Sequence, residues 1–599
     1  MLILIFNRMI IMNTKFQYKI VSLIIALSFF GACSLEEYNP SGSTASIVFS
    51  TEEGMNALVN SAYYNFGAQF YGREDVMFLF EGGTDLWYMG ARGTYAEQLL
   101  VYTERLDATT GQIKNTWQRL YEIVNYANAG INRIDNVRYT DDNVKLAKEG
   151  ELRFVRAYAY WMIAETFGGV TLRTTETTGV PLTAKRSPLK DFYDLIISDL
   201  ERAVQILPYN QDQVGRADKK AAYGMLARTA LTRASYLEYF ENNRAEANLF
   251  YQKALDAANE LINNQGQYGC RLYDTYDEVF APSNNKNNAE ALWVITHSTN
   301  SALNPQPKNA NRLFRWYLAK YTGLCGMPSL EVTEYGRDGA SRLMPTKFLL
   351  DIFDEDIDAR YYGSFREAFN LPLTTQSYSW TTTDIARFEK SFSPGSVVIQ
   401  PGDTALFYTK KVITDKDSRS YGVKDINDTY NFDGTISTNA NNNPYYPSLK
   451  KFRDPDRNPG SDAGTKNVVV MRLAEMYLIA AEASYKLNKT SPDAAYYINV
   501  LRTRAAVKTP VDHTSQMQVS ISDIDLDFLL DERARELAGE HLRWPDLKRT
   551  KQLENRLGQG KQNPDITAFN PEKHYLRPIP QAELDVLENA EEYGQNPGY

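Results

Sequence analysis

Two short segments combine aromatic rings, charged side chains and glycines in a way that suits ligand binding. In the first, residues 81–95, the rings could stack on the faces of sugar rings while a carboxylate or guanidinium group binds hydroxyl groups. Its candidate ligand-binding residues are Asp85, Trp87, Tyr88, Arg92 and Tyr95. The alternative interpretation is that these side chains only pack within a loop.

The second segment, residues 312–321, has a similar composition and lies in an irregular part of the chain. Its candidate ligand-binding residues are Arg312, Trp316, Tyr317 and Tyr321. Rings that belong to loops contribute little to a hydrophobic core. We therefore expect that replacing Trp87 and Trp316 by alanine weakens ligand binding and leaves the melting temperature nearly unchanged.

The acidic run from Asp354 to Asp358 is the best candidate for paired catalytic carboxylates of the kind that cleave glycosidic bonds. Four acids on one short segment are more simply explained as a solvated or capped turn. The four histidines are too dispersed for metal-ligand spacing, and no serine lies in a nucleophile elbow. The sequence therefore predicts that the protein is not an enzyme and has no catalytic residue, metal site or cofactor.

The composition is that of a folded protein with many aromatic residues. The hydrophobic fraction of 43% and the charged fraction of 23% are ordinary for a globular chain. The 40 tyrosines and 7 tryptophans favour a ligand surface rich in rings, although tyrosines at helix contacts would give the same count. A formal net charge of -9 would repel a nucleic-acid backbone, which argues against nucleic-acid binding.

The N-terminus has the pattern of a secreted lipoprotein. Lys15 and Lys19 precede an apolar run from Ile20 to Phe30, and Gly31-Ala32-Cys33 follows it. The run is shorter than the about 20 apolar residues that a membrane-spanning helix needs. Small residues before a cysteine are what a lipoprotein peptidase requires, so this pattern indicates a cleaved signal rather than a transmembrane anchor.

We accordingly expect residues 1–32 to be a signal peptide, Cys33 to carry the lipid, and residues 33–50 to form a tether. Contact with the membrane would then be through the lipid anchor only. The apolar stretch before Met12 is not needed for such a signal, so we expect translation to begin at Met12. Cys270 and Cys325 could pair in an oxidising compartment, but we expect two buried thiols.

Amphipathic periodicity predicts a mainly helical protein. Ile113, Trp117, Leu120 and Val124 recur at steps of three and four, and similar patterns cover 152–167, 192–206, 217–236 and 245–262. Ser50 with Glu53 is a possible capping box for the first helix. The paired rhythm, with small residues where helices could approach closely, favours a tetratricopeptide-like helical repeat, that is, an α-solenoid scaffold.

Three regions follow the expected tether. Residues 51–270 form an N-terminal helical region, and 271–467 are a large irregular, loop-rich insertion carrying a few short strands, such as the apolar run 291–296. Residues 468–599 form a C-terminal helical region that packs back on the repeats. Because fixing a loop costs about 1–2 kcal/mol per residue, we expect the insertion to carry the ligand region.

Seven segments, taken in order, resemble the SusD/RagB family of outer-membrane nutrient-binding lipoproteins. Five of them are ELRFVRAYAYWMIAETFGGVTLR at 151–173, PTKFLLDIFDEDIDARYYGSF at 345–365, VVVMRLAEMYLIAAEA at 468–483, LLDERARELAGEHLRWPDLKRT at 529–550 and RPIPQAELDVLENAEEYGQNPGY at 577–599. The other two are residues 216–236 and 498–506. With the lipoprotein signal, the likeness spans nearly all of the mature chain.

The resemblance implies four tetratricopeptide-like repeats, a ligand region built from loops, and a SusC-like TonB-dependent transporter on which the protein acts as a lid. It also implies a lipid-anchored location at the outer membrane, facing the exterior. The acidic start Ser34-Leu35-Glu36-Glu37 resembles an export tag, although a plain solvated linker would have the same sequence character. With the aromatic content, the resemblance favours an oligosaccharide or polysaccharide ligand. The alternatives are the same import role for peptides or another nutrient, and a scaffold that binds only protein.

The motifs near the C-terminus also predict structure. Within 529–550, acidic and basic residues have the spacing of ion pairs along a helix face, worth tenths of a kcal/mol each when exposed. These residues are Glu532, Arg533, Arg535, Glu536, Glu540 and Arg543. Pro578 and Pro580 predict a rigid terminal segment that docks against the body.

Overall fold

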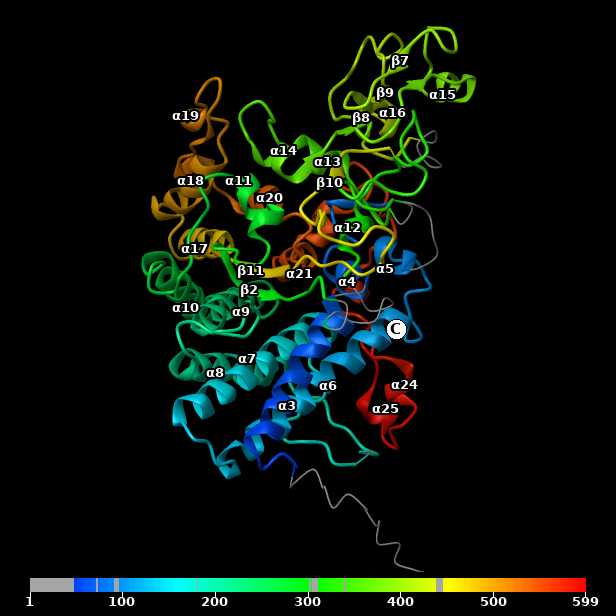
Figure 1. The fold of residues 1–599 in the computed structure, drawn as a ribbon. Coiled ribbons are helices and arrows are strands. Elements are labelled where there is room, and N and C mark those ends of the chain that lie inside the picture. The colour runs from blue at the N-terminus through cyan, green and yellow to red at the C-terminus, as the bar shows by residue number, and fades with distance from the viewer. Residues whose placement is uncertain are drawn as a thin grey trace, which may run out of the picture.

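The computed structural model describes residues 48–71, 74–90, 96–179, 181–300, 303, 311–338, 341–437 and 445–599 (Figure 1). The expected signal peptide, Met12 and Cys33 lie outside the described residues, and so do Arg92 and Tyr95. None of the described helices is both long and apolar enough to cross a membrane.

Eight long helices form a continuous stack along the lower and left parts of Figure 1. They are α3 (Glu52–Tyr64), α6 (Gly111–Arg133), α7 (Asp142–Phe167), α8 (Leu189–Ile206), α9 (Lys219–Tyr239), α10 (Arg244–Asn263), α17 (Leu473–Leu487) and α18 (Asp493–Ala505). Each helix contacts the next in this order, so the described part of the chain contains four helix pairs. The predicted mainly helical, tetratricopeptide-like fold is confirmed.

Local signals explain where these helices begin, end and meet. Thr51, not Ser50, caps α3, because its hydroxyl accepts a hydrogen bond from the Gly54 amide at 3.1 Å. The predicted cap was therefore wrong by one residue. α7 ends at Gly168, whose φ of 72° is a conformation that glycine adopts without steric cost. Alanines such as Ala227 on α9 and Ala258 on α10 are buried, which lets the two helices approach closely.

The loop-rich region projects from the stack and is closed at its base by a two-stranded ribbon. β2 (Ala291–Ile295) pairs antiparallel with β11 (Val468–Arg472), and Val468 lies opposite Ile295. α17 follows β11 directly and packs on α10, although residues 264–472 separate the two helices in sequence. The chain thus leaves the stack after α10, builds the irregular region and returns to complete the last helix pair.

The other described strands are short. β1 (Trp87–Met89) pairs with β3 (Leu343–Pro345), β4 (Phe365–Arg366) with β10 (Ser448–Leu449), and β6 (Tyr378–Ser379) with β7 (Val398–Ile399). β5 (Ala368–Asn370), β8 (Thr404–Tyr408) and β9 (Gly422–Lys424) form a three-stranded sheet. They lie mostly in the upper part of Figure 1, in the region predicted to be irregular.

Short helices fill the space between these elements. Before α17 they are α4 (Glu74–Phe80), α5 (Glu97–Val101), α11 (Tyr276–Phe280), α12 (Leu313–Trp316), α13 (Lys347–Asp351), α14 (Arg360–Ser364), α15 (Thr382–Arg387) and α16 (Ile426–Thr429). After α18 they are α19 (Thr514–Met517), α20 (Leu526–Leu537), α21 (Arg543–Arg549), α22 (Leu553–Arg556), α23 (Pro571–His574), α24 (Gln581–Leu584) and α25 (Ala590–Tyr593).

The C-terminal segment docks against the body, as predicted. The Arg577 amide donates to the Thr166 carbonyl at 2.8 Å, and the Asn596 side-chain amide donates to the Phe167 carbonyl at 3.0 Å. Both acceptors belong to the last turn of α7. α24 and α25 consequently lie beside α6 in Figure 1.

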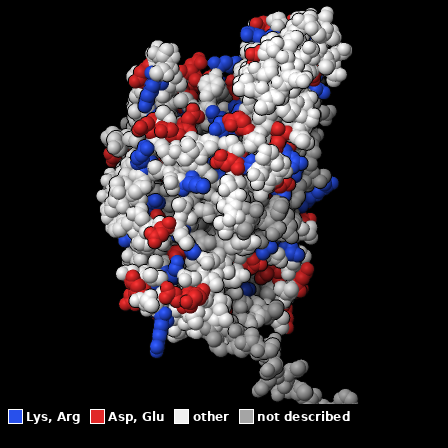
Figure 2. Space-filling view, in the orientation of Figure 1, with Lys and Arg blue, Asp and Glu red and all other residues white. Residues whose placement is uncertain are grey.

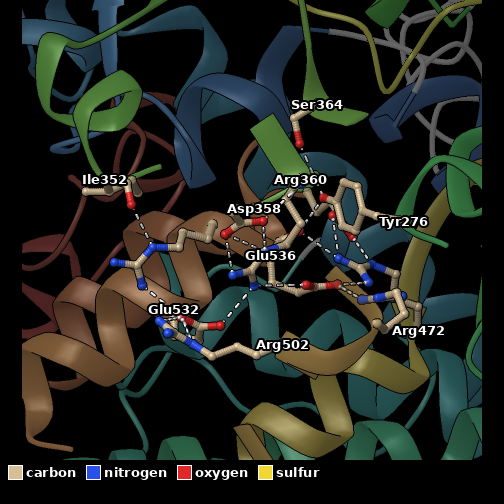
Figure 3. A network of polar contacts seen from close by, with 12 residues as sticks. Tyr276, Ile352, Asp358, Arg360, Ser364, Arg472, Arg502, Glu532 and Glu536 are labelled. Carbon is tan, nitrogen blue, oxygen red and sulfur yellow. Dashed lines mark hydrogen bonds and ion pairs between the residues drawn. The ribbon is translucent and has the colours of Figure 1, made fainter. Parts of the chain in front are cut away.

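A buried network of ion pairs centres on α20 (Figure 3). Glu536 pairs with Arg472 of β11 at 2.7 Å, with Arg360 of α14 at 3.3 Å, and with Arg504 of α18. Glu532, one turn earlier, pairs with Arg360 at 2.9 Å and with Arg502 at 2.7 Å. The network thus joins a helix of the stack, the closing ribbon and the loop-rich region.

The charges in this network largely satisfy one another. Glu290, just before β2, pairs with Arg472 at 2.7 Å and with Arg504 at 3.0 Å. Burial alone would raise the pKa of Glu536, but the guanidinium groups of Arg504, Arg472 and Arg360 outweigh it and hold that pKa far below its usual range. Glu536 is therefore a carboxylate at any physiological pH.

The predicted ion pairs of this segment do hold the fold, but most of them join α20 to other elements instead of running along its own face. Glu532 and Glu536 are fully buried, and only the pair of Glu532 with Arg535 runs along α20 itself. Spacing of three and four residues shows that charged side chains share a helix face, but it does not show whether other elements cover that face. Here the face is covered, so the acids find their partners on distant segments.

Replacing Glu536 by glutamine should lower the free energy of unfolding by about 3–5 kcal/mol, because it leaves three buried arginines without their shared carboxylate. Urea or guanidinium denaturation followed by circular dichroism measures this loss. Glu591→Gln, at an exposed position of α25, is the matched control and should change stability by less than about 0.5 kcal/mol. Equal stability of the two variants would contradict the role assigned to Glu536.

Stability should also fall as the pH drops from about 6.5 to 4. Burial lowers the pKa of His541, in the turn after α20, to about 4, and burial lowers that of His297 to about 4 as well. Between about pH 6.5 and 4 these histidines are protonated in the unfolded chain but remain neutral in the folded one. Proton binding therefore stabilises the unfolded state and lowers the free energy of unfolding by about 3 kcal/mol per histidine at pH 4. His541→Asn, which tolerates the φ of 62° at this position, should flatten the pH dependence of the unfolding free energy in that window.

Candidate functional site

The two segments predicted to bind ligand meet in space. β1 pairs with β3, with Trp87 opposite Pro345, and the Trp87 ring packs edge-on against the Tyr317 ring with 4.9 Å between centroids. The indole Nε1 of Trp87 donates to a carboxylate oxygen of Glu81 at 2.6 Å. Residues 230 positions apart in the sequence thus pack together. We call the paired strands the β1–β3 ribbon, and the helices α4 and α12 flank it.

Most of the predicted contact residues, however, are buried. Asp85, Trp87, Tyr88, Trp316, Tyr317 and Tyr321 are no more than 2% exposed. Asp85 pairs with Arg543 at 2.6 Å and with Arg556 at 3.1 Å, so its carboxylate serves the fold. The expectation that Trp87 and Trp316 contribute little to the core is wrong. In this conformation these six side chains offer no face to a ligand, and their assignment as contacts stays a prediction that requires the region to open.

Arg312 is the described candidate that remains accessible, and it belongs to a larger group that we call the arginine cluster: Arg312, Arg315, Arg337, Arg342, Glu74 and Asp462. Arg312 and Arg315 lie at α12, and Arg342 immediately precedes β3. The Arg342 amide donates to the Trp316 carbonyl at 2.6 Å, and its carbonyl accepts from the Gly90 amide at 3.1 Å. The buried ribbon therefore fixes the backbone that carries these guanidinium groups.

Burial and mutual repulsion shape the charges of this cluster. Burial lowers the pKa of Arg315, Asp462 opposes that shift, and the positive charges of Arg337, Arg312 and Arg342 add to it. Burial also raises the pKa of Glu74, although Arg342 partly offsets this. On the face of the molecule drawn in Figure 2, acidic and basic side chains are interspersed, with no broad field of one sign.

An exposed ring lies at the other end of the β1–β3 ribbon. The Tyr88 hydroxyl donates to the Gly434 carbonyl, in a turn held by a hydrogen bond from the Asn431 amide to the Thr435 carbonyl at 2.8 Å. Phe432 stands in this turn with its side chain fully exposed. A phenyl ring without core contacts can stack on a ligand at little structural cost.

Among the residues of this surface that sequence reasoning missed are Arg337, Arg342, Asp462 and Phe432. They are single charged or aromatic residues in loops, without periodic spacing. Gly336, whose φ of 96° favours glycine, and Gly434, whose φ of 83° does so too, mark the turns that present Arg337 and Phe432. Such turns were the signal that could have drawn attention to them.

A separate cavity of about 450 Å³ lies between α6 and the loop that follows α7, lined in part by Trp117, Tyr121 and Arg173. Two asparagines that line it form hydrogen bonds to the backbone. The Asn128 side-chain amide donates to the carbonyls of Arg173 and Thr175, at 3.0 and 3.1 Å, and the Asn125 side chain accepts from the Thr177 amide. These contacts hold the loop on α6 and engage both asparagines in the fold.

The remaining candidates for chemistry have structural roles. Asp358 pairs with Arg360 at 2.7 Å and Glu355 with Lys410 at 2.6 Å, so the acidic run does not present paired free carboxylates. Within the described residues no group of three or more His, Cys, Asp or Glu is arranged to hold a metal ion. Cys270 and Cys325 are free and buried, which confirms the prediction of two buried thiols.

Comparison with known proteins identifies the family. Residues 289–599 match the family described as the SusD family, which is more than half of the chain. This chain belongs to the SusD family. Residues 35–231 match a second family, described as starch-binding and associating with the outer membrane.

Similar proteins cover most of the length of this SusD-family chain. SusD-like protein P2 of Formosa agariphila is 26% identical over 97% of this chain and all of its own length. The starch-binding protein SusD of Bacteroides thetaiotaomicron is 25% identical over 78% of this chain and 75% of its own. A solved structure of a laminarin-binding SusD-like protein has a TM-score of 0.61 at 20% identity, covering 92% of this chain and 100% of that one, which shows a shared fold.

Replacing Trp87 by alanine should lower the free energy of unfolding by about 3–5 kcal/mol, because it removes a fully buried ring and leaves Glu81 without the indole donor. Thermal and chemical denaturation measure the effect. Tyr209→Ala, at a partly exposed tyrosine on the stack, is a control that should lose far less. A melting temperature unchanged by Trp87→Ala would contradict the core role of this ring and support the exposed ligand-binding role predicted from the sequence.

Proposed function

We propose that this SusD-family protein binds a saccharide nutrient at the outer-membrane surface and delivers it to a SusC-like TonB-dependent transporter, over which it acts as a lid. The observation that carries the proposal is the SusD-family match across residues 289–599. The starch-binding and laminarin-binding names of similar proteins support a saccharide as the ligand class. The match to a family associating with the outer membrane supports the location.

The architecture suits binding without catalysis. A rigid helix stack carries a loop-rich region whose accessible described groups are guanidinium side chains and an aromatic ring, which bind hydroxylated and anionic ligands. The acidic run, which was the best candidate for glycosidic cleavage, is engaged in ion pairs. We therefore assign the protein a capture role, with chemistry on the nutrient left to other proteins.

The anchor completes this proposal. Lipidation at Cys33 would tether the protein to the membrane, and the residues up to α3 would give it reach. A lid that binds its transporter and its ligand together needs such a tether, because tethering raises the effective concentration of one partner at the other. Mass spectrometry of the cell-derived protein for an acylated N-terminal Cys33 tests this part.

Calorimetric titration of the protein lacking residues 1–33 against polysaccharides, oligosaccharides and peptides tests the ligand class. Saturable binding to saccharides alone supports the proposal. Binding to peptides alone would replace saccharide by peptide in the same import role. Co-purification with a TonB-dependent transporter from the outer membrane tests the partner, and a protein found alone there would contradict the lid role.

Phe432→Ala should weaken saccharide binding roughly tenfold and leave the melting temperature within about 1 °C, because the ring makes no core contacts but can stack on a sugar face. Leu373→Ala, which removes another highly exposed apolar side chain from the same region, is the matched control and should bind normally. Equal affinities of the two variants would remove Phe432 from the binding surface.

A further inference from the structure

Two hollows adjoin on the helix stack, beside the loop that joins α8 to α9. One, of about 310 Å³, lies between this loop and residues 285–294. The other, of about 390 Å³, lies between the loop, α3 and α7. Both are lined by Gln211, Gln213 and Arg216, so they form one depression, which we call the amide groove. Each volume is within the range of about 300–1,000 Å³ that is usual for ligand pockets.

We infer that the amide groove is a saccharide-binding site of its own, which holds a neutral glycan through its hydroxyl groups. None of the described residues that line it belongs to the arginine cluster or to the turn that carries Phe432. The inference rests on the proposed function, because it takes the ligand to be a saccharide. It goes further by adding a binding site on the scaffold and by naming the chemistry of that site.

Amide side chains make up most of the polar lining of the groove. In the first hollow they are Asn210, Gln211, Gln213, Asn285, Asn287 and Asn288. In the second, Asn56 and Asn60 join the two glutamines. An amide side chain offers two donors and an acceptor on one planar group, and a hydroxyl group is likewise both donor and acceptor. Amides therefore match the hydroxyl groups of a sugar without requiring any charge on it.

The fold engages some of these amides and leaves others for a ligand. The Asn288 side chain donates to the Val279 carbonyl at 2.7 Å and accepts from the Glu290 amide at 3.0 Å, which fixes one wall of the groove. Asn210 and Asn287, in contrast, are exposed, and neither side chain forms a hydrogen bond within the described part of the chain. Their amide groups can therefore bind hydroxyl groups without giving up a contact of the fold.

The loop between α8 and α9 is held rigidly on three sides. The Trp293 indole of β2 donates to the Gly215 carbonyl at 3.0 Å. Arg216 pairs with Glu151 of α7 at 3.1 Å, and its guanidinium group lies 5.1 Å from the centre of the Tyr63 ring of α3. The groove is therefore formed before a ligand arrives, and a preformed site loses little entropy on binding.

An aromatic ring lies beside the groove. Tyr209 directly precedes Asn210 and is 40% exposed. The Lys219 ammonium group lies 4.4 Å from the centre of this ring, and the centre of the Tyr268 ring lies 5.4 Å from it. A ring held in place at the edge of an amide-lined groove can pack on the apolar face of a sugar while the amides bind its hydroxyl groups.

The charges of the groove favour an uncharged ligand. Its ionisable side chains carry both signs: Lys148, Arg216, Lys220, Lys286, Asp212 and Asp218. Arg216 has Glu151 as its partner, and Lys220 lies 3.6 Å from Asp218. Because the signs are mixed and the innermost charges are paired, the groove does not select for an anionic or a cationic group.

The strand beside the groove argues against a peptide as its ligand. Extended peptides bind mainly by pairing their backbone with an exposed strand edge. The residues of β2 (Ala291–Ile295) are at most 7% exposed, so this strand offers little backbone for such pairing. Recognition in the groove therefore depends on side chains, which suits a sugar.

Binding of neutral saccharides is measured by calorimetric titration of the protein lacking residues 1–33 with maltoheptaose, laminarihexaose, xylohexaose and mannohexaose. Polygalacturonate and a peptide mixture are titrated alongside. We expect saturable binding to at least one neutral oligosaccharide. Its affinity should change little as NaCl is raised, because the ligand carries no charge that salt could screen.

The groove variant is Asn210→Ala with Asn287→Ala, and the matched control is Asn132→Ala with Asn263→Ala. All four asparagines are exposed and form no side-chain hydrogen bond within the residues that the structure describes. Both variants thus lose the same groups at no cost in contacts of the fold, and their melting temperatures should be similar. We expect the groove variant to weaken binding of the neutral oligosaccharide by about tenfold or more, and the control to change it less than about twofold.

The outcomes separate this inference from the proposed function. Equal affinities and equal numbers of sites in the two variants would overturn the inference, because the groove would not be the site, and would leave the proposed function in place. Binding to polygalacturonate without binding to any neutral oligosaccharide would do the same. Binding to peptides and to no saccharide would count against both.

Discussion

Glu536 brings together arginines from three separate parts of the chain: α14 in the loop-rich region, β11 in the closing ribbon and α18 in the stack. Each of these segments would be mobile relative to the others if held by loop contacts alone. A buried carboxylate whose partners come from different elements can be satisfied only when all of them are in place. Glu536, with its neighbours Glu532 and Glu290, therefore helps to fix the position of the insertion relative to the scaffold.

A second group of buried ion pairs fixes the position of the candidate surface. Asp85 forms ion pairs with Arg543 and Arg556. The Leu542 amide donates to Glu81, so residues near the C-terminus hold the segment that leads into β1 in place. β1 in turn pairs with β3, and the backbone beside β3 carries Arg342. Exposed guanidinium groups thus sit on a frame that is rigid because its own charges are buried and paired. This arrangement suits a binding site, in which preorganised groups lose little entropy when the ligand arrives.

The helix stack could be predicted from the sequence, whereas the function of individual rings could not. Ile113, Trp117 and Leu120 recur at a helical period, and periodicity depends only on local geometry, so the helices followed directly. The sequence around Trp87 would be the same whether its ring were exposed in a loop or packed against Tyr317. Tertiary contacts decide between these two outcomes, and the local sequence does not show them. The acids of α20 show the same dependence, because their spacing fixed the shared face but not the arginines that cover it. Phe432 and Arg337 carry no pattern at all, since single residues at turns owe their importance to where the turn lies.

The return of the chain to the stack after the insertion has a consequence for how the protein is made. α17 packs on α10 and completes the last helix pair, so the stack cannot close until residues 473–505 have been synthesised. Most solenoids grow by adding each repeat to the one before it, with local contacts that form quickly. Here the last addition is a long-range closure, and contacts between residues far apart in the sequence form more slowly than local ones. A nascent chain therefore completes its stack only late in synthesis.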